Sequence, residues 1–348
     1  MTNRFQKLAK TPLFIGIDAE WGLSMRLDSV NRFPWNMTLG AIQDLKLIEE
    51  AGKQMALQSK KLGIHFNFAP VLDINTNPKN PIIGNRSFGE DKEKVTERAM
   101  ALMTGLQSNG VFATGKHFPG HGDTEVDSHL GLPRVEHSIE QIRKVDLLPF
   151  ASIIKQHNPG MIMTAHIQYP ALDSSTFVSK DGESMLKPAT LSRKILHGVL
   201  REQLGYNGVI VTDALDMAGI SKFFTHTEAV VQTFAAGADI ALMPVKLQHP
   251  GELQALSELL TALESAVQSG ALDQAELAQS YQRIVALKQQ YPLLPAEKTP
   301  AQQVGAKGDC SKATNRRGEL LTRRDSLSRS PDAIRELPQG SPDCIRGT

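Results

Sequence analysis

Six short apolar runs, separated by stretches with helical periodicity, constrain the fold of this chain more than any other feature. Between residues 38 and 61, apolar side chains recur every three or four positions, and Gly63 ends the pattern. Such alternation is typical of a parallel β-sheet with helices on both faces. The expected strands are 13–17, 64–74, 111–113, 160–166, 208–213 and 238–243, and the expected helices are 38–61, 91–109, 138–156, 190–204, 226–236, 251–268 and 273–290.

A polar residue stands at the end of nearly every expected strand. Parallel strands end at the same edge of a sheet, and the active site of a (β/α) barrel lies at that edge. The sequence therefore predicts an α/β fold of the (β/α)8 TIM-barrel type. A doubly wound sheet is the alternative, but no Gly-x-Gly-x-x-Gly motif follows the first strand, which argues against a dinucleotide site. The strand-end residues are Asp18, Asp73, Lys116, His166 and Asp213.

The segment 116–129 contains one Lys, three His and two Asp within fourteen positions. Its glycines and its proline exclude a regular helix, and the apolar run 111–113 precedes it, so we expect an irregular loop after a strand. Loops of this kind are where catalytic groups concentrate. A solvated loop with scattered charges is the alternative, and the density of His and Asp favours a functional role.

Within this loop, Asp127 and His129 are two positions apart. In extended backbone such residues face the same side, so the carboxylate can orient the imidazole and stabilise its charged form. The alternative is that both side chains are only solvated.

Asp213 ends the expected strand 208–213, where a carboxylate would point into the mouth of a barrel. An N-cap for the following helix is an equally good interpretation of this residue. Asp216 is a weaker candidate because it lies beyond the strand end.

Several other charged side chains sit at or just after strand ends and could bind a ligand rich in hydroxyl groups. Each one alone could equally form a surface ion pair. Their expected position on one face favours a common polar pocket. They are Asp18, Arg26, Arg86, Lys116 and His117.

Composition excludes several classes of protein. The net charge of +1 gives no electrostatic reason to bind nucleic acid, and no apolar run approaches the ~20 residues that span a bilayer. No histidine pair has the spacing of a zinc protease, so we expect no metal and no cofactor. Residues 1–8 lack the apolar core of a signal peptide, and both cysteines lie near the C-terminus. A reducing compartment, the cytoplasm, fits these observations; the periplasm is the alternative if the natural chain starts earlier.

The composition changes after Pro295. Residues 296–348 contain no Phe, Trp or Tyr and are rich in Arg, Ser, Pro and Gly. Such a segment cannot bury enough apolar surface to fold, so we expect a disordered tail at 296–348 and a single catalytic domain at 1–295. A nucleic-acid-binding arm is a weaker interpretation, because acidic residues are interspersed among the arginines.

Four motifs together resemble glycoside hydrolase family 3, in its β-N-acetylglucosaminidase (NagZ-type) branch. The resemblance covers roughly residues 11–290, and the Asp-Ser-His of the central motif is typical of this branch. Family members carry additional β/α elements before the strand that begins here at Leu13, so six of the eight barrel units are expected. The motifs are Ile15-Gly16-Ile17-Asp18-Ala19-Glu20 with Arg26, Gly84 to Gly89, Lys116 to His129, and Val211 to Met217.

The resemblance implies a retaining exo-β-N-acetylglucosaminidase that acts on peptidoglycan or chitin fragments without a cofactor. Asp213 matches the nucleophile of the family, His129 the acid/base and Asp127 the residue that orients it. Asp18, Arg26, Arg86, Lys116 and His117 match residues that hold the sugar hydroxyls. A phosphorylase and an inactive sugar-binding module are the alternatives. The sequence leaves the aglycone and the oligomeric state open.

Overall fold

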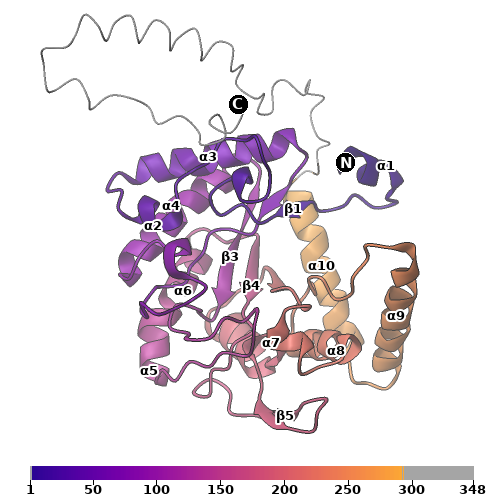
Figure 1. Ribbon diagram of the computed structural model, residues 1–348. Helices are drawn as coiled ribbons and strands as arrows, with labels where there is room; N and C mark the ends of the chain where they lie inside the picture. The colour runs from indigo at the N-terminus through magenta and orange to yellow at the C-terminus, as the bar shows by residue number, and fades with distance from the viewer. Residues whose placement is uncertain (1, 292, 294–348) are drawn as a thin grey trace, which may run out of the picture. The chain divides into compact units, whose positions relative to one another are not determined.

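A curled parallel sheet forms the centre of the protein (Figure 1). The computed structural model describes residues 2–291 and 293, and the features below belong to one unit, residues 1–27 and 32–297. In this part of the chain the sheet has five strands in the order β1-β2-β3-β4-β7, and every neighbouring pair is parallel. The strands are β1 (Gly16–Ile17), β2 (Phe66–Asn67), β3 (Phe112–Phe118), β4 (Met161–Thr164) and β7 (Val209–Thr212).

Helices follow these strands, as the hydrophobic pattern predicts. The larger ones are α3 (Leu45–Lys61), α4 (Lys92–Gln107), α6 (Leu148–Gln156), the π-helix η5 (Lys194–Gln203), α8 (His226–Ala236), α9 (Leu253–Gln268) and α10 (Gln274–Gln290). Short elements fill the connections: α1 (Thr2–Leu8), α2 (Asn36–Gly40), α5 (Ile139–Gln141), the π-helical segment Ile142–Asp146 and α7 (Ala218–Ser221). The predicted α/β architecture is confirmed.

The two faces of the sheet bury different side chains. Ile162 and Ile210 belong to the large core formed with α3, α4, α6 and η5. Met161, Met163 and Val211 alternate with them and pack in a second core, which includes Leu287 and Tyr291 at the end of α10. Because side chains alternate between the faces of a strand, α10 must cover the face opposite to the other helices.

In the described part of the chain the five strands form a half-barrel that begins at β1 and ends at β7, and the backbone of residues 239–240 is hydrogen-bonded to part of β7. The expected sixth strand, 238–243, is wrong: Ile240 forms one isolated bridge to Val211. The amide of Leu242 donates to the side-chain Oγ1 of Thr212 at 3.0 Å instead of to a backbone carbonyl, which interrupts the hydrogen-bond ladder.

Other elements also differ from expectation: the strand expected at 64–74 is reduced to β2, Phe66–Asn67. Strand β3 continues through Phe118, so Lys116 and His117 lie in a strand and not in the loop expected after residue 113. The expected helix 38–61 is divided, because Asp44 accepts from the amide of Lys46 and starts α3 anew. An antiparallel hairpin of β5 (Thr176–Val178) and β6 (Ser184–Leu186), which the hydrophobic pattern did not indicate, follows β4.

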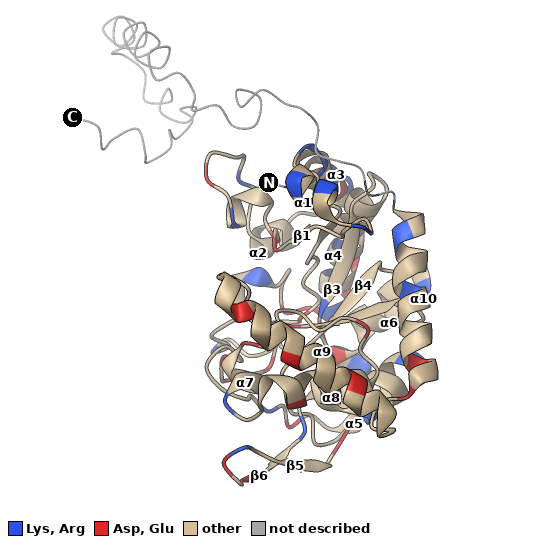
Figure 2. Cartoon of the chain, turned by 90° about the vertical axis from the view of Figure 1, so that its right-hand side faces the viewer, with Lys and Arg blue, Asp and Glu red and all other residues tan. Residues whose placement is uncertain are grey.

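No helix in the described part of the chain is long and apolar enough to cross a bilayer. The charged residues of α9 are all acidic, whereas α10 carries charges of both signs (Figure 2). The expected tail, 296–348, lies outside the described residues.

Candidate active site

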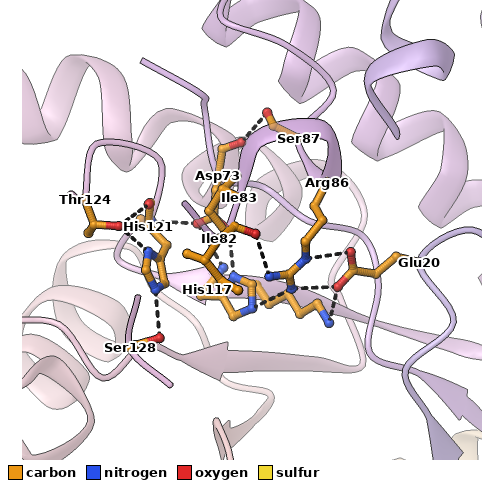
Figure 3. Close-up of polar contacts among 12 residues, drawn as sticks. Glu20, Asp73, Ile82, Ile83, Arg86, Ser87, His117, His121, Thr124 and Ser128 are labelled. Atoms are coloured by element: carbon orange, nitrogen blue, oxygen red, sulfur yellow. Dashed lines mark hydrogen bonds and ion pairs between the residues drawn. The ribbon is translucent and has the colours of Figure 1, made fainter. Parts of the chain in front are cut away.

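Lys116 of β3 lies at the centre of a buried chain of charges. Its ammonium donates to Asp18 Oδ1 at 3.0 Å and to Glu20 Oε1 at 2.8 Å, and only 2% of its side chain is exposed. Each of these two carboxylates also binds an arginine. Arg26 donates to Asp18 Oδ2 at 3.0 Å. Arg86 donates to both oxygens of Glu20 (Figure 3). Two of the three Lys116 N–H groups are therefore used, which leaves one for a ligand.

The neighbours of these groups keep them ionised. Burial alone raises the pKa of Glu20, but the positive charges of Lys116 and Arg86 lower it far below its usual value. Burial lowers the pKa of Lys116, and Glu20 and Asp18 raise it by more. The site thus has fixed charges that can bind hydroxyl groups in a defined orientation.

His117 has its ring held from both sides. Its Nδ1 lies 2.6 Å from Asp73 Oδ2, and its Nε2 lies 3.4 Å from the guanidinium Nη2 of Arg86 (Figure 3). Since Arg86 can only donate, Nε2 accepts and Nδ1–H donates to Asp73. The other oxygen of Asp73 accepts from the amides of His117 and His121, at 3.2 and 2.7 Å.

Asp213 follows β7 directly and lies in the electrostatic field of the same groups. Burial alone raises its pKa, but His117, His166, the amide of Ala214 and Lys116 lower it below the usual value for a carboxyl group. The amide of Ala214 donates to Asp213 Oδ1 at 2.8 Å, and His166 Nε2 donates to the carbonyl of Ala214 at 3.0 Å. Asp213 is thus a half-buried carboxylate that remains ionised.

Asp127 and His129 form the expected pair. The distance from His129 Nδ1 to Asp127 Oδ1 is 2.8 Å, and the same oxygen accepts from the amide of His129 at 2.8 Å. The His129 side chain is 53% exposed, so its Nε2 side is open to a ligand. His129 also acts electrostatically on His166, whose ring lies beside Ala214.

Comparison with known proteins assigns the chain to one family. The model of the glycosyl hydrolase family 3 N terminal domain matches residues 2–287. The chain belongs to glycosyl hydrolase family 3.

Three family relatives or similar structures illustrate the match. Beta-hexosaminidase A of Pseudoalteromonas piscicida is 46% identical over 306 residues, covering 84% of this chain and 50% of that protein. A family 3 β-N-acetylglucosaminidase from Paenibacillus sp. str. FPU-7 superposes with a TM-score of 0.78 at 40% identity, over 90% of this chain and 57% of that one. A β-glucoside phosphorylase superposes with a TM-score of 0.75 at 27% identity, over 90% and 56%. This chain spans about half the length of these three proteins.

Sequence reasoning placed most of the family 3 site residues on one edge of the sheet, and the structure brings them together. Asp18, Arg26, Lys116 and Arg86 form one chain of ion pairs through Glu20, and His117 joins them at Arg86. The possible role of Asp213 as a helix N-cap is wrong, because the next helix, α7, begins only at Ala218 and its cap is Met217.

The sequence analysis did not assign four residues of this cluster to the candidate site. Glu20 was read only as part of a motif, and Asp73 and His166 only as strand-end residues, although the strand-end rule could have added both to the site. Only its place in the loop 116–129 pointed to His121, and no spacing or neighbouring residue in the sequence indicated its contacts. In the described part of the chain, no group of three or more His, Cys, Asp or Glu is arranged to hold a metal ion.

Proposed function

We propose that this chain is the catalytic domain of a retaining exo-β-N-acetylglucosaminidase. The observation that carries the proposal is the half-buried, ionised Asp213, placed directly after a strand among His117, His166 and Lys116. An ionised carboxylate in that position is a nucleophile for the anomeric carbon of a glycoside. The names of the hexosaminidase and the N-acetylglucosaminidase relatives support N-acetylglucosamine as the sugar.

In the proposed first step, Asp213 attacks the anomeric carbon and a proton from His129 goes to the departing glycosidic oxygen. In the second step, neutral His129 takes a proton from water, and the resulting hydroxide displaces Asp213 from the sugar. Asp127 orients the ring through the 2.8 Å contact at Nδ1, so that the Nε2 nitrogen exchanges the proton.

The sugar hydroxyls have donors and acceptors available in the same region. Lys116 keeps one free N–H, Asp18 and Arg26 are partly exposed, and His117 lies beside Arg86. We infer that Asp18, Arg26, Lys116 and His117 contact the sugar, whereas Arg86 mainly fixes Glu20 and His117. The natural substrates would be peptidoglycan or chitin fragments with terminal β-linked N-acetylglucosamine.

Turnover of an aryl β-N-acetylglucosaminide tests this function, with the aryl β-glucoside as the comparison. Asp213→Ala should abolish turnover, while Asp216→Ala should retain much of it, because Asp216 lies beyond the strand end. Equal activity of Asp213→Ala and the parent would remove the nucleophile assignment. Binding of N-acetylglucosamine without any turnover by the parent would instead favour a sugar-binding module.

A phosphorylase is the second candidate, and the acid/base residue favours it. A neutral imidazole repels an incoming phosphate less than a carboxylate would, and one similar structure is a β-glucoside phosphorylase. Product analysis in phosphate buffer separates the two reactions: hydrolysis releases N-acetylglucosamine, and phosphorolysis releases its 1-phosphate.

A further inference from the structure

Residues 126–131 form the loop that carries Asp127 and His129, here called the acid/base loop. Most of its side chains are open to solvent: Leu130 is 69% exposed and Val126 48%. Ser128 is the exception, since it is 2% exposed although it lies between the two catalytic candidates. A buried serine in an otherwise exposed loop indicates that the loop is fixed through this residue.

His121 receives the buried side chain of Ser128. The distance from Ser128 Oγ to His121 Nε2 is 2.9 Å, and His121 Nδ1 lies 2.7 Å from Thr124 Oγ1 (Figure 3). Because the Thr124 hydroxyl donates to the carbonyl of His121, Nδ1–H donates to Thr124 and Nε2 accepts from Ser128. His121 is itself fixed by its amide, which donates to Asp73 Oδ1.

A second set of contacts joins the acid/base loop to the segment after Asp213. The amide of Gly219 donates to the carbonyl of Ser128 at 3.0 Å, and Lys222 Nζ donates to the carbonyl of Leu130 at 2.7 Å. A Cβ on Gly219 would lie 2.9 Å from the carbonyl oxygen of Gly131 and 3.0 Å from that of Ser128. Glycine at this position therefore permits the close approach of the two segments.

We propose that His121, Gly219 and Lys222 are positioning residues that hold the acid/base loop on the segment carrying the nucleophile, and so set the place of His129 relative to Asp213. None of the three needs to contact the sugar. The proposal rests on the proposed function for its catalytic consequence, whereas the loop attachment itself can be measured without turnover.

Lys222→Met is the sharpest test, because the side chain is exposed and its loss should not affect folding. A displaced His129 protonates the leaving oxygen poorly, so kcat on a disaccharide should fall about tenfold with little change in KM. A dinitrophenyl glycoside, whose leaving group needs no proton, should lose much less in kcat/KM. Lys222→Arg should restore most of the activity, since arginine can reach the same carbonyl.

Lys180→Met is the matched control. Lys180 Nζ donates to the carbonyl of Ser221 at 2.9 Å, so this lysine also caps the segment after Asp213 but does not reach the acid/base loop. It should leave both substrates near the parent values. Equal losses on the two substrates in Lys222→Met, or equal effects of Lys180→Met, would overturn the positioning role.

Hydrogen–deuterium exchange of the full chain supplies the readout that is independent of catalysis. The amides of His129, Leu130 and Gly131 donate within the loop to Asp127, and they should exchange faster in Lys222→Met and Ser128→Ala than in the parent or in Lys180→Met. Unchanged exchange would overturn the attachment. Faster exchange in the two variants, together with a parent that turns over no N-acetylglucosaminide, would support the attachment while rejecting the proposed function.

Discussion

Burial disfavours the charged forms of both Asp213 and His121, but the two residues end in different states. Around Asp213, the neighbouring imidazoles, an amide and Lys116 outweigh burial and keep its pKa low. Around His121, burial and the nearby His117 lower the pKa to about 4. The first residue therefore stays negative and the second stays neutral near pH 7, which suits a nucleophile and a hydrogen-bonding support respectively.

The pH dependence of stability should report the neutral His121. Its pKa falls from 6.5 in the unfolded chain to about 4 in the folded one, so the unfolded state binds more protons between these values. Stability should therefore fall as pH drops from 6.5 to 4, by at most roughly 3 kcal/mol from this residue. His121→Gln should lose less stability over the same range, as measured by urea unfolding at pH 7 and pH 5. A parallel loss in parent and variant would show that His121 does not titrate this way.

The acid/base role of His129 predicts unequal effects on two leaving groups. His129→Ala should lower kcat/KM on a disaccharide by about 10²–10⁴-fold, and much less on a dinitrophenyl glycoside. Asp127→Ala should cause a smaller loss of kcat/KM on the disaccharide, because the imidazole remains but is less well oriented. Leu130→Ala, an exposed neighbour in the same loop, is the control. A uniform loss across the two substrates would reject the acid/base role.

Among the helices, α3 and α4 approach each other through glycines. A Cβ on Gly105 of α4 would lie 2.0 Å from the carbonyl oxygen of Glu49, and a Cβ on Gly52 of α3 would lie 2.4 Å from that of Leu102. Each helix thus presents a glycine to the backbone of the other. The pair packs in one core with Ala113 and Phe118 of β3, the strand that carries Lys116 and His117.

Gly105→Ala should push these two helices apart. Overpacking of a well-filled interface costs about 1–3 kcal/mol, and a contact with backbone cannot be relieved by a side-chain rotation. The urea midpoint at pH 7 should fall accordingly. Gly198→Ala in η5 is the control: a Cβ there meets nothing within 4 Å, and alanine favours the helix. Equal midpoints for the two variants would contradict this view of the interface.

At the scale of the whole molecule, Asp239 connects elements that are far apart in the sequence. Its side chain is 0% exposed and accepts from Arg201 of η5 at 2.7 Å and from Arg283 of α10 at 2.7 Å. It also accepts from the amide of Ile210 in β7 at 2.7 Å. This carboxylate therefore attaches α10, which covers the second face of the sheet, to the last strand.

Asp239→Ala should destabilise the protein strongly. It leaves two half-buried arginines without their shared carboxylate and one buried amide without its acceptor, and breaking a buried ion pair costs about 3–5 kcal/mol. Glu276→Ala removes an exposed ion pair between α10 and Arg193 and should cost less than about 1 kcal/mol. Chemical unfolding of both variants measures the difference, and similar losses would show that Asp239 is not the main attachment of α10.

The parallel α/β architecture, and the meeting of several candidate site residues at one edge of the sheet, could be predicted from the sequence alone. Alternating apolar runs and helical periodicity follow from local physics, and the carboxyl ends of parallel strands meet whatever the details of packing. Asp18, Lys116, His117 and Asp213 could therefore be placed on one edge before any coordinates were known. The Asp127–His129 contact was also local, but it forms in a turn and not in the expected extended backbone, since the amides of Leu130 and Gly131 donate to the carbonyl of Asp127.

Only the tertiary structure decided which side chain meets which partner across the chain. Glu20 becomes the shared partner of Lys116 and Arg86, and His121 turns inward to Ser128, through contacts that no local pattern encodes. The failure of 238–243 as a strand has the same origin, since the Thr212 side chain takes the place of a backbone acceptor. Hydrophobic periodicity records whether a residue is buried, whereas the partner of a buried charge depends on how distant segments pack.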